Sequence, residues 1–437
     1  SRQTNRAQAL LGTIAGKAGL LAGKASLLVL VLACASVAMA QVPRERVFTA
    51  NQTAGTITAF DTDKAQAPDL IEFRVPDTVN DPPGYAPLSA PTDVALNPML
   101  HEGYVTEQDA ASLVVFDPLS NDNLLADVPF GGQIMTRIPL SIAQPFGVAV
   151  TPDGRLAFVS NAARLSGVGG PTQDMISVVD CERSVEIGTI DVSVVGQPLF
   201  PALGPIDVAV SPDGAFVYVA CTGDITLAGD PRQVVVIDVA TLTPIFAVLL
   251  PTADLPFQIA VTPDNAFVYV AHPIDVDGDG RGEVSFFDVP TLTTGVLFGL
   301  AAGVLPVDVF SNRASTIVYF LDGAAVANVV QVASVATQSV ITSVVGIGGG
   351  PFIDAGTRGC GNSTDEFAYI SDNAGSDVVQ FSETTNITRA TFPVDAGPVG
   401  IAVIALQELS AAGAGNIQRI RESREDRNKG LCFVATA

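Results

Sequence analysis

The stretch PIDVAVSPDGAFVYVAC, residues 205–221, decides the fold, because the chain repeats it about every fifty residues. Three further copies match it closely: PTDVALNPMLHEGYVTE from Pro91, PFGVAVTPDGRLAFVSN from Pro145 and PFQIAVTPDNAFVYVAH from Pro256. Weaker copies are expected to start at Pro306, Pro351 and Pro398. A fixed period of this length indicates repeated supersecondary units that bury their faces against one another.

Each copy predicts four antiparallel strands. In the copy from Pro205, the apolar run IDVAV precedes the turn SPDG, in which Pro presets φ and Gly takes the left-handed conformation. The β-branched and aromatic run FVYVAC predicts a second strand, and VVVID and PIFAVLL predict the third and fourth. Four antiparallel strands in about fifty residues are typical of one blade of a β-propeller.

The number of blades follows from the two ends of the repeat region. Six copies contain all four strands, whereas residues 398–406 supply a first strand with no second strand after it. Near the N-terminus, residues 46–51, 56–61 and 70–75 supply three strands with no first strand before them. Joined, these strands complete a seventh blade and close the ring, which removes exposed sheet edges. The sequence therefore predicts an all-β, seven-bladed propeller over residues 41–406.

The repeat resembles the YVTN-type β-propeller repeats of bacterial exported and surface proteins. The resemblance rests on the block PDG-x-x-VYVxN…VxVID-xx-T…P-x-x-VAV, and residues 104–107 (YVTE) nearly reproduce the signature itself. It implies a seven-bladed propeller and an exported location. It implies no single activity, because members include binding and surface proteins and related propellers include lactonases, and a fold does not fix a function.

Both ends of the chain carry features typical of export. In residues 1–40, basic residues precede the apolar run LLVLVLACASVAMA, and Ala38-Met39-Ala40 provides a small-x-small cleavage site before Gln41. This pattern predicts a signal peptide, and the alternative is an uncleaved membrane anchor. Residues 407–437 are expected to form a flexible tail whose last residues, CFVATA, resemble the CFIATA box of exported bacterial proteins, which implies sorting or attachment. We therefore expect a bacterial protein that is periplasmic, displayed on the cell surface or secreted.

Charge and composition exclude several function classes. The net charge is −23, and residues 41–414 contain 13 basic residues against 42 acidic ones. Such a surface repels nucleic acid and anionic lipid and favours divalent cations or basic partners. Contact with a membrane is therefore expected only through the signal or the tail. The chain has no CxxC or CxxCH motif, no Trp and two His, which argues against haem attachment, zinc ribbons and His-centred catalysis.

Strand direction alternates within a blade and so divides the connections between two faces. The first-to-second and third-to-fourth turns share one face, called here the short-turn face, with a long connection expected at 357–366. The second-to-third and blade-to-blade connections share the other face, called here the long-loop face. Most long, irregular segments lie on the long-loop face, and we expect any binding site there, over the central channel.

The sharpest site motif is an acidic loop on the long-loop face, between FVYVAH and EVSFFD. Carboxylates of Asp275, Asp277, Asp279 and Glu283, with the main-chain carbonyl of Arg281, would suit a hard cation such as calcium. The loop lacks the glutamate that ends an EF-hand loop, and its spacing looks like the calcium loops of integrin-type propellers. We predict a structural calcium ion here; the alternative is an acidic, glycine-rich turn without metal.

Two function classes remain open, and the non-enzymatic one is preferred. The first is an exported binding or scaffold propeller that uses its long-loop face for a protein, glycan or cell-surface partner. The second is a lactonase-type propeller hydrolase. Its candidate residues do not share a diagnostic spacing: Asp224, Asp230, Asp254, Asp275 and His272. No catalytic set is predicted, and the side chains at the channel mouth would distinguish the two classes.

Overall fold

The computed structural model describes a ring of β-sheets in the second of two compact units, residues 1–43 and 44–437. The described residues are 45–62, 71–73, 88–97, 99–100, 102–118, 134–161, 174–197, 200–224, 230–252, 254–297, 299–323, 329–345, 359–361 and 367–405. The predicted signal peptide and C-terminal tail lie outside these ranges. Among the described residues, no helix combines the length and the hydropathy needed to cross a membrane.

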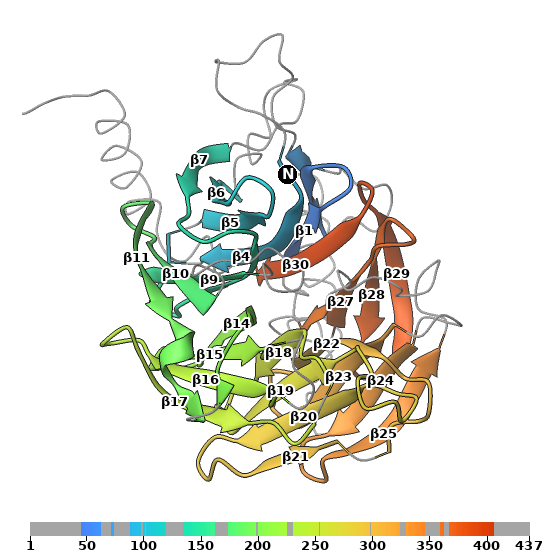
Figure 1. The fold of residues 1–437 in the computed structure, drawn as a ribbon. Coiled ribbons are helices and arrows are strands. Elements are labelled where there is room, and N and C mark those ends of the chain that lie inside the picture. Colours follow the sequence, from blue (N-terminus) through green and yellow to red (C-terminus); the bar gives the residue numbers. More distant parts are fainter. Residues whose placement is uncertain are drawn as a thin grey trace, which may run out of the picture. The chain divides into compact units, whose positions relative to one another are not determined.

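Seven four-stranded antiparallel sheets form the blades, as the sequence predicts (Figure 1). Blade 1 contains β4 (Pro91–Asn97), β5 (Glu102–Glu107), β6 (Ser112–Phe116) and β7 (Ile134–Pro139). Blade 2 contains β8 (Pro145–Val150), β9 (Leu156–Asn161), β10 (Met175–Asp180) and β11 (Val185–Asp191). Blade 3 contains β14 (Pro205–Val210), β15 (Phe216–Cys221), β16 (Gln233–Asp238) and β17 (Thr243–Leu249).

The second half of the ring repeats this order. Blade 4 contains β18 (Gln258–Val261), β19 (Phe267–His272), β20 (Glu283–Asp288) and β21 (Thr294–Val296). Blade 5 contains β22 (Pro306–Ser311), β23 (Ile317–Asp322), β24 (Val329–Ser334) and β25 (Ser339–Val345). Blade 6 contains β26 (Gly359–Gly361), β27 (Phe367–Asp372), β28 (Asp377–Ser382) and β29 (Ile387–Pro393).

Blade 7 is built from both ends of the repeat region. Its strands are β30 (Pro398–Ala405), β1 (Glu45–Asn51), β2 (Thr56–Asp61) and β3 (Ile71–Phe73), and β30 pairs with β1 from Glu45↔Ala405 to Asn51↔Pro398. The first strands of neighbouring blades contact one another around the whole ring, including β26 with β30 and β30 with β4. The predicted composite blade and the closed ring are therefore confirmed (Figure 1).

The first-to-second connection of blade 6 is shorter than predicted. The sequence predicts a copy from Pro351 with a long connection at 357–366, but Gly359–Gly361 form the strand β26, with Cys360 opposite Tyr369. Residues 351–358 lie outside the described ranges. In blade 3 the residue opposite the equivalent tyrosine is Ala209. The connection at 362–366 is thus as long as that at 211–215 in blade 3. The prediction was wrong because no Pro-Asp-Gly turn follows Pro351 to mark the register.

The hydrophobic core lies between neighbouring blades. Second and third strands are buried along their length, as in β15 and β16, whereas the fourth strands β11, β17 and β29 are largely exposed. In five blades the second strand buries a tyrosine at the same position of the repeat: Tyr104, Tyr218, Tyr269, Tyr319 and Tyr369. Apolar side chains from two adjacent sheets interlock there, so each blade is stable only beside its neighbours.

Two short elements lie on the long-loop face between blades 2 and 3. The 3-10 helix η2 (Val192–Val194) is capped by the Asp191 carboxylate, which accepts a hydrogen bond from the main chain of Ser193. The strands β12 (Gly196–Gln197) and β13 (Phe200–Pro201) then form a separate two-stranded sheet.

Candidate functional site

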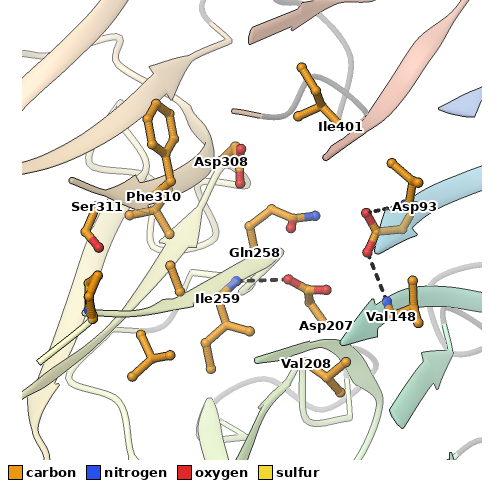
Figure 2. Close-up of a pocket in the computed structure, with 15 residues that line it drawn as sticks. Asp93, Val148, Asp207, Val208, Gln258, Ile259, Asp308, Phe310, Ser311 and Ile401 are labelled. Carbon is orange, nitrogen blue, oxygen red and sulfur yellow. Dashed lines mark hydrogen bonds between the residues drawn. The ribbon is translucent and has the colours of Figure 1, made fainter. Parts of the chain in front are cut away.

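A polar ring lies in the central channel, near the start of the first strands. Asp93, Asp207, Gln258 and Asp308 line a cavity of about 350 Å³ whose other lining includes apolar residues of the same strands, such as Ile259 (Figure 2). Each of the three Asp residues is the second residue after the proline that opens its copy. In each of β4, β14 and β22 the pairing register shifts between that proline and the following residues. Such bulges break the strict alternation of a strand and re-aim its side chains.

Two of these carboxylates fasten one blade to the next. Asp93 Oδ2 accepts a hydrogen bond of 2.9 Å from the main-chain N–H of Val148, in blade 2. Asp207 Oδ2 accepts one of 3.1 Å from Ile259, in blade 4 (Figure 2). Both bonds satisfy buried N–H groups of a neighbouring first strand, which would be costly to leave unpaired. These channel carboxylates therefore have a structural role.

Gln258 contributes a donor to the same cavity. Its side chain is 2% exposed, and among the described residues nothing accepts a hydrogen bond from its Nε2. Its amide end lies in the space between Asp93, Asp207 and Asp308 (Figure 2). The described lining contains no Lys, Arg or His. The cavity thus suits water or a neutral or cationic polar group, and it repels an anion.

His272, one of the hydrolase candidates, is part of the core. The residue ends β19 and is fully buried, with Nδ1 3.0 Å from the Asp254 carbonyl oxygen and Nε2 2.7 Å from Ser285 Oγ. Because a carbonyl oxygen only accepts, Nδ1 carries the proton and Nε2 accepts from the serine hydroxyl. Burial lowers the pKa of His272 to about 3, so the ring is neutral. Ser285 is also fully buried, so this pair is closed to substrate.

The remaining hydrolase candidates do not converge on the channel. The Asp230 carboxylate accepts a hydrogen bond from the main chain of Asp224, so those two residues order their own loop. Asp254 and Asp275 lie together in a different place, at the acidic loop. None of the five candidates lines the described channel cavity.

The acidic loop folds around its first carboxylate. Asp275 accepts main-chain hydrogen bonds from Gly278, at 2.6 Å, and from Gly280, at 2.9 Å. Both glycines have positive φ, of 79° and 86°, which allows this tight turn. Asp277 accepts a bond of 3.0 Å from the main chain of Asp279.

The structure divides the five predicted metal-binding residues. Asp275 and Asp277 lie together, whereas the Asp279 carboxylate pairs with the Arg281 guanidinium at 2.9 Å. Arg281 also donates to the Leu300 carbonyl oxygen, and Glu283 begins β20, opposite His272.

Asp254 joins the acidic loop from a distant part of the sequence. One carboxylate oxygen from each of Asp254, Asp275 and Asp277 lies within 4.8 Å of the other two. Asp254 is 0% exposed; its Oδ1 accepts from Val276 N–H at 2.6 Å, and its Oδ2 has no partner among the described residues. Burial raises the pKa of Asp254 to about 6. From the sequence alone Asp254 is only a hydrolase candidate, because no spacing connects it with the loop.

Comparisons with known proteins support the fold alone. No protein-family model matches the chain, and no curated protein matches it. Among solved structures, hydrazine synthase from Kuenenia stuttgartiensis is similar with a TM-score of 0.58 at 16% identity, covering 75% of this chain and 99% of that one. A functionally unknown protein from Desulfotomaculum acetoxidans gives 0.55 at 16% identity, covering 82% and 98%. A proposed 6-phosphogluconolactonase from Bacteroides fragilis gives 0.58 at 12% identity, covering 84% and 99%.

Proposed function

We propose that this protein is an exported, non-enzymatic β-propeller that binds a protein, glycan or cell-surface component through its long-loop face. The proposal includes a bacterial extracytoplasmic location and a structural calcium ion in the acidic loop. The observation that carries it is the use of the channel carboxylates: Asp93 and Asp207 hold neighbouring blades together. Because these two channel carboxylates bind the main chain of neighbouring blades, they stabilise the ring, and the loops remain as the surface for binding a partner.

Exposed apolar side chains on the long-loop face support a role in binding. Val194 is 68% exposed in η2, and Ile274 and Val276 are 44% and 50% exposed beside the acidic loop. Apolar side chains on irregular loops, surrounded by acidic residues, are suited to anchor a partner that also carries basic or neutral polar groups.

The alternative is a lactonase-type hydrolase, and the similarity in fold to the proposed 6-phosphogluconolactonase keeps it open. The described channel disfavours a phosphorylated substrate, because Asp93, Asp207 and Asp308 present negative charge and no basic side chain accompanies them. General acid–base catalysis would also need a group of suitable pKa within reach of the substrate, and His272 is buried and neutral.

A hydrolysis assay separates the two classes. The purified protein is assayed with 6-phosphogluconolactone and with an uncharged aliphatic lactone, each with calcium and with chelator. We expect rates equal to spontaneous hydrolysis. A rate above background that disappears in Asp308→Asn, at unchanged melting temperature, would establish the hydrolase instead.

A binding assay tests the preferred class directly. Labelled protein is sedimented with bacterial cell envelopes and, separately, applied to immobilised glycans. We expect saturable binding that Val276→Ser weakens several-fold. The matched control is Ile387→Ser, because Ile387 is equally exposed, at 51%, on the outer strand β29. Equal losses in both variants, or no saturable binding to either material, would count against the long-loop face.

A further inference from the structure

We propose that Asp254, Asp275 and Asp277 hold a calcium ion that fastens the acidic loop to the connection between blades 3 and 4. The inference refines the calcium component of the proposed function, and it stands whether or not the propeller binds a partner. It replaces a site contained within one loop by a site between two segments.

The two segments already lie against each other. Asp254 belongs to the connection between β17 and β18, whereas the acidic loop joins β19 to β20. Leu255 and Ile274 form an isolated antiparallel bridge, with Leu255 N–H donating to the Ile274 carbonyl at 3.3 Å. Next to this bridge, Val276 N–H donates to Asp254 Oδ1. The position of Asp254 relative to the loop is therefore fixed by main-chain contacts.

The second carboxylate oxygen of Asp254 is free to bind a cation. The side chain is 0% exposed, and Oδ2 has no hydrogen-bond partner among the described residues. Burying a carboxylate oxygen without a partner is costly, and the cost is higher beside two further carboxylates. Among the described residues, no salt bridge joins a basic side chain to any of the three. Arg232 is near enough for its charge to interact with that of Asp254, but its guanidinium donates to the Thr222 carbonyl oxygen. A cation between the three carboxylates would satisfy Oδ2 and neutralise the repulsion.

The donor set favours calcium over other cations. All three side-chain donors are carboxylate oxygens, which hard cations prefer, and there is no His or Cys for zinc or copper among them. Calcium accepts irregular sets of six to eight oxygens, which water would complete here, whereas magnesium demands a near-ideal octahedron. A site with three carboxylates that is partly open to solvent suits a Kd of about 10⁻⁴–10⁻³ M, the range of extracellular calcium modules.

Calcium titration of the purified full chain tests the site. We expect calcium to raise the melting temperature by about 2 °C at ten times Kd, and equimolar magnesium to have a clearly smaller effect. Isothermal titration gives the stoichiometry, which we expect to be one ion per chain at this site. No shift with calcium, or an equal shift with magnesium, would overturn the proposal.

Variants identify the ligands. Asp254→Asn keeps an acceptor for Val276 N–H, and Asp277→Asn alters an exposed position where folding is not at risk. We expect each to weaken calcium binding at least tenfold. The control is Asp279→Asn, whose carboxylate pairs with Arg281, and it should bind normally. Loss of binding in Asp279→Asn with normal binding in Asp254→Asn would show that the loop alone holds the ion, and the inference would be wrong.

Proteolysis supplies a readout at the loop itself. Calcium should protect the bond after Arg281 from trypsin, because the ion fastens the loop, while cleavage after Arg183, which lies in another blade and is 71% exposed, stays unchanged. Protection at Arg281 should be lost in Asp254→Asn. If the calcium effects occur and the envelope binding assay fails, the metal site stands and the proposed partner interaction does not.

Discussion

Acidification tests the buried state of His272. Its pKa is lowered to about 3 in the folded protein, against about 6.5 for an unfolded chain. Between these values the unfolded state binds a proton that the folded state does not, so stability is full above pH 6.5 and is lost as pH falls through this window. At pH 4.5, two units below the unfolded pKa, the loss is about 3 kcal/mol at 1.36 kcal/mol per unit.

The assay is urea unfolding at pH 7.5 and pH 4.5, followed by far-ultraviolet circular dichroism. The comparison is with His272→Gln, whose amide can donate to the Asp254 carbonyl and accept from Ser285, and which does not titrate. Other acidic groups titrate in this range in both proteins, so their contributions cancel in the difference. We expect the wild type to lose about 3 kcal/mol more than the variant between the two pH values. Equal losses would refute the assignment of a neutral, buried imidazole.

Three further outcomes are expected. Gly147→Ala should lower the free energy of unfolding, measured in urea, by about 1–3 kcal/mol. The added Cβ would overlap Asp207 Oδ1 and disturb the hydrogen bond that the Asp207 carboxylate accepts from Ile259 N–H. Arg46→Met should cost about 3–5 kcal/mol, because Arg46 is 2% exposed and pairs with Asp61 at 2.7 Å; adding Asp61→Asn should recover part of the loss, and no recovery would show that the pair is not coupled. N-terminal sequencing of the exported protein should begin at Gln41, and retention of residues 1–40 would show an anchor instead.

The sequence predicts what is local and periodic. Strand spacing, turn chemistry and the incomplete copies at the two ends were sufficient for the closed ring, including the pairing of β30 with β1. The connection predicted at 357–366 in blade 6 was too long, because the turn that marks the register is missing from the sequence and strand pairing places Gly359–Gly361 in β26. Repeats predict a strand only where their turn residues remain.

The sites were less predictable because they depend on side chains that the repeat brings together from different blades. Asp207 is visible as a repeated position, but its bond to Ile259 requires the packing of two first strands. Asp275 and Asp277 stand out by their spacing, whereas Asp254 is an ordinary loop acid until the Leu255–Ile274 bridge places it beside them. Burial also determines the protonation of His272, which sequence alone does not show.

The pairing of β1 with β30 has a consequence for how the ring is made. Glu45 pairs with Ala405, so the strand pairing that closes the ring joins residues with nearly the largest sequence separation in the propeller. Contacts of this kind slow folding, since the loop entropy is lost before the contact forms. During synthesis or translocation, the edge of β1 that pairs with β30 stays open until residues 398–405 arrive. The time that this edge remains unpaired, rather than the stability of any blade, then sets the interval in which the chain is most prone to aggregation.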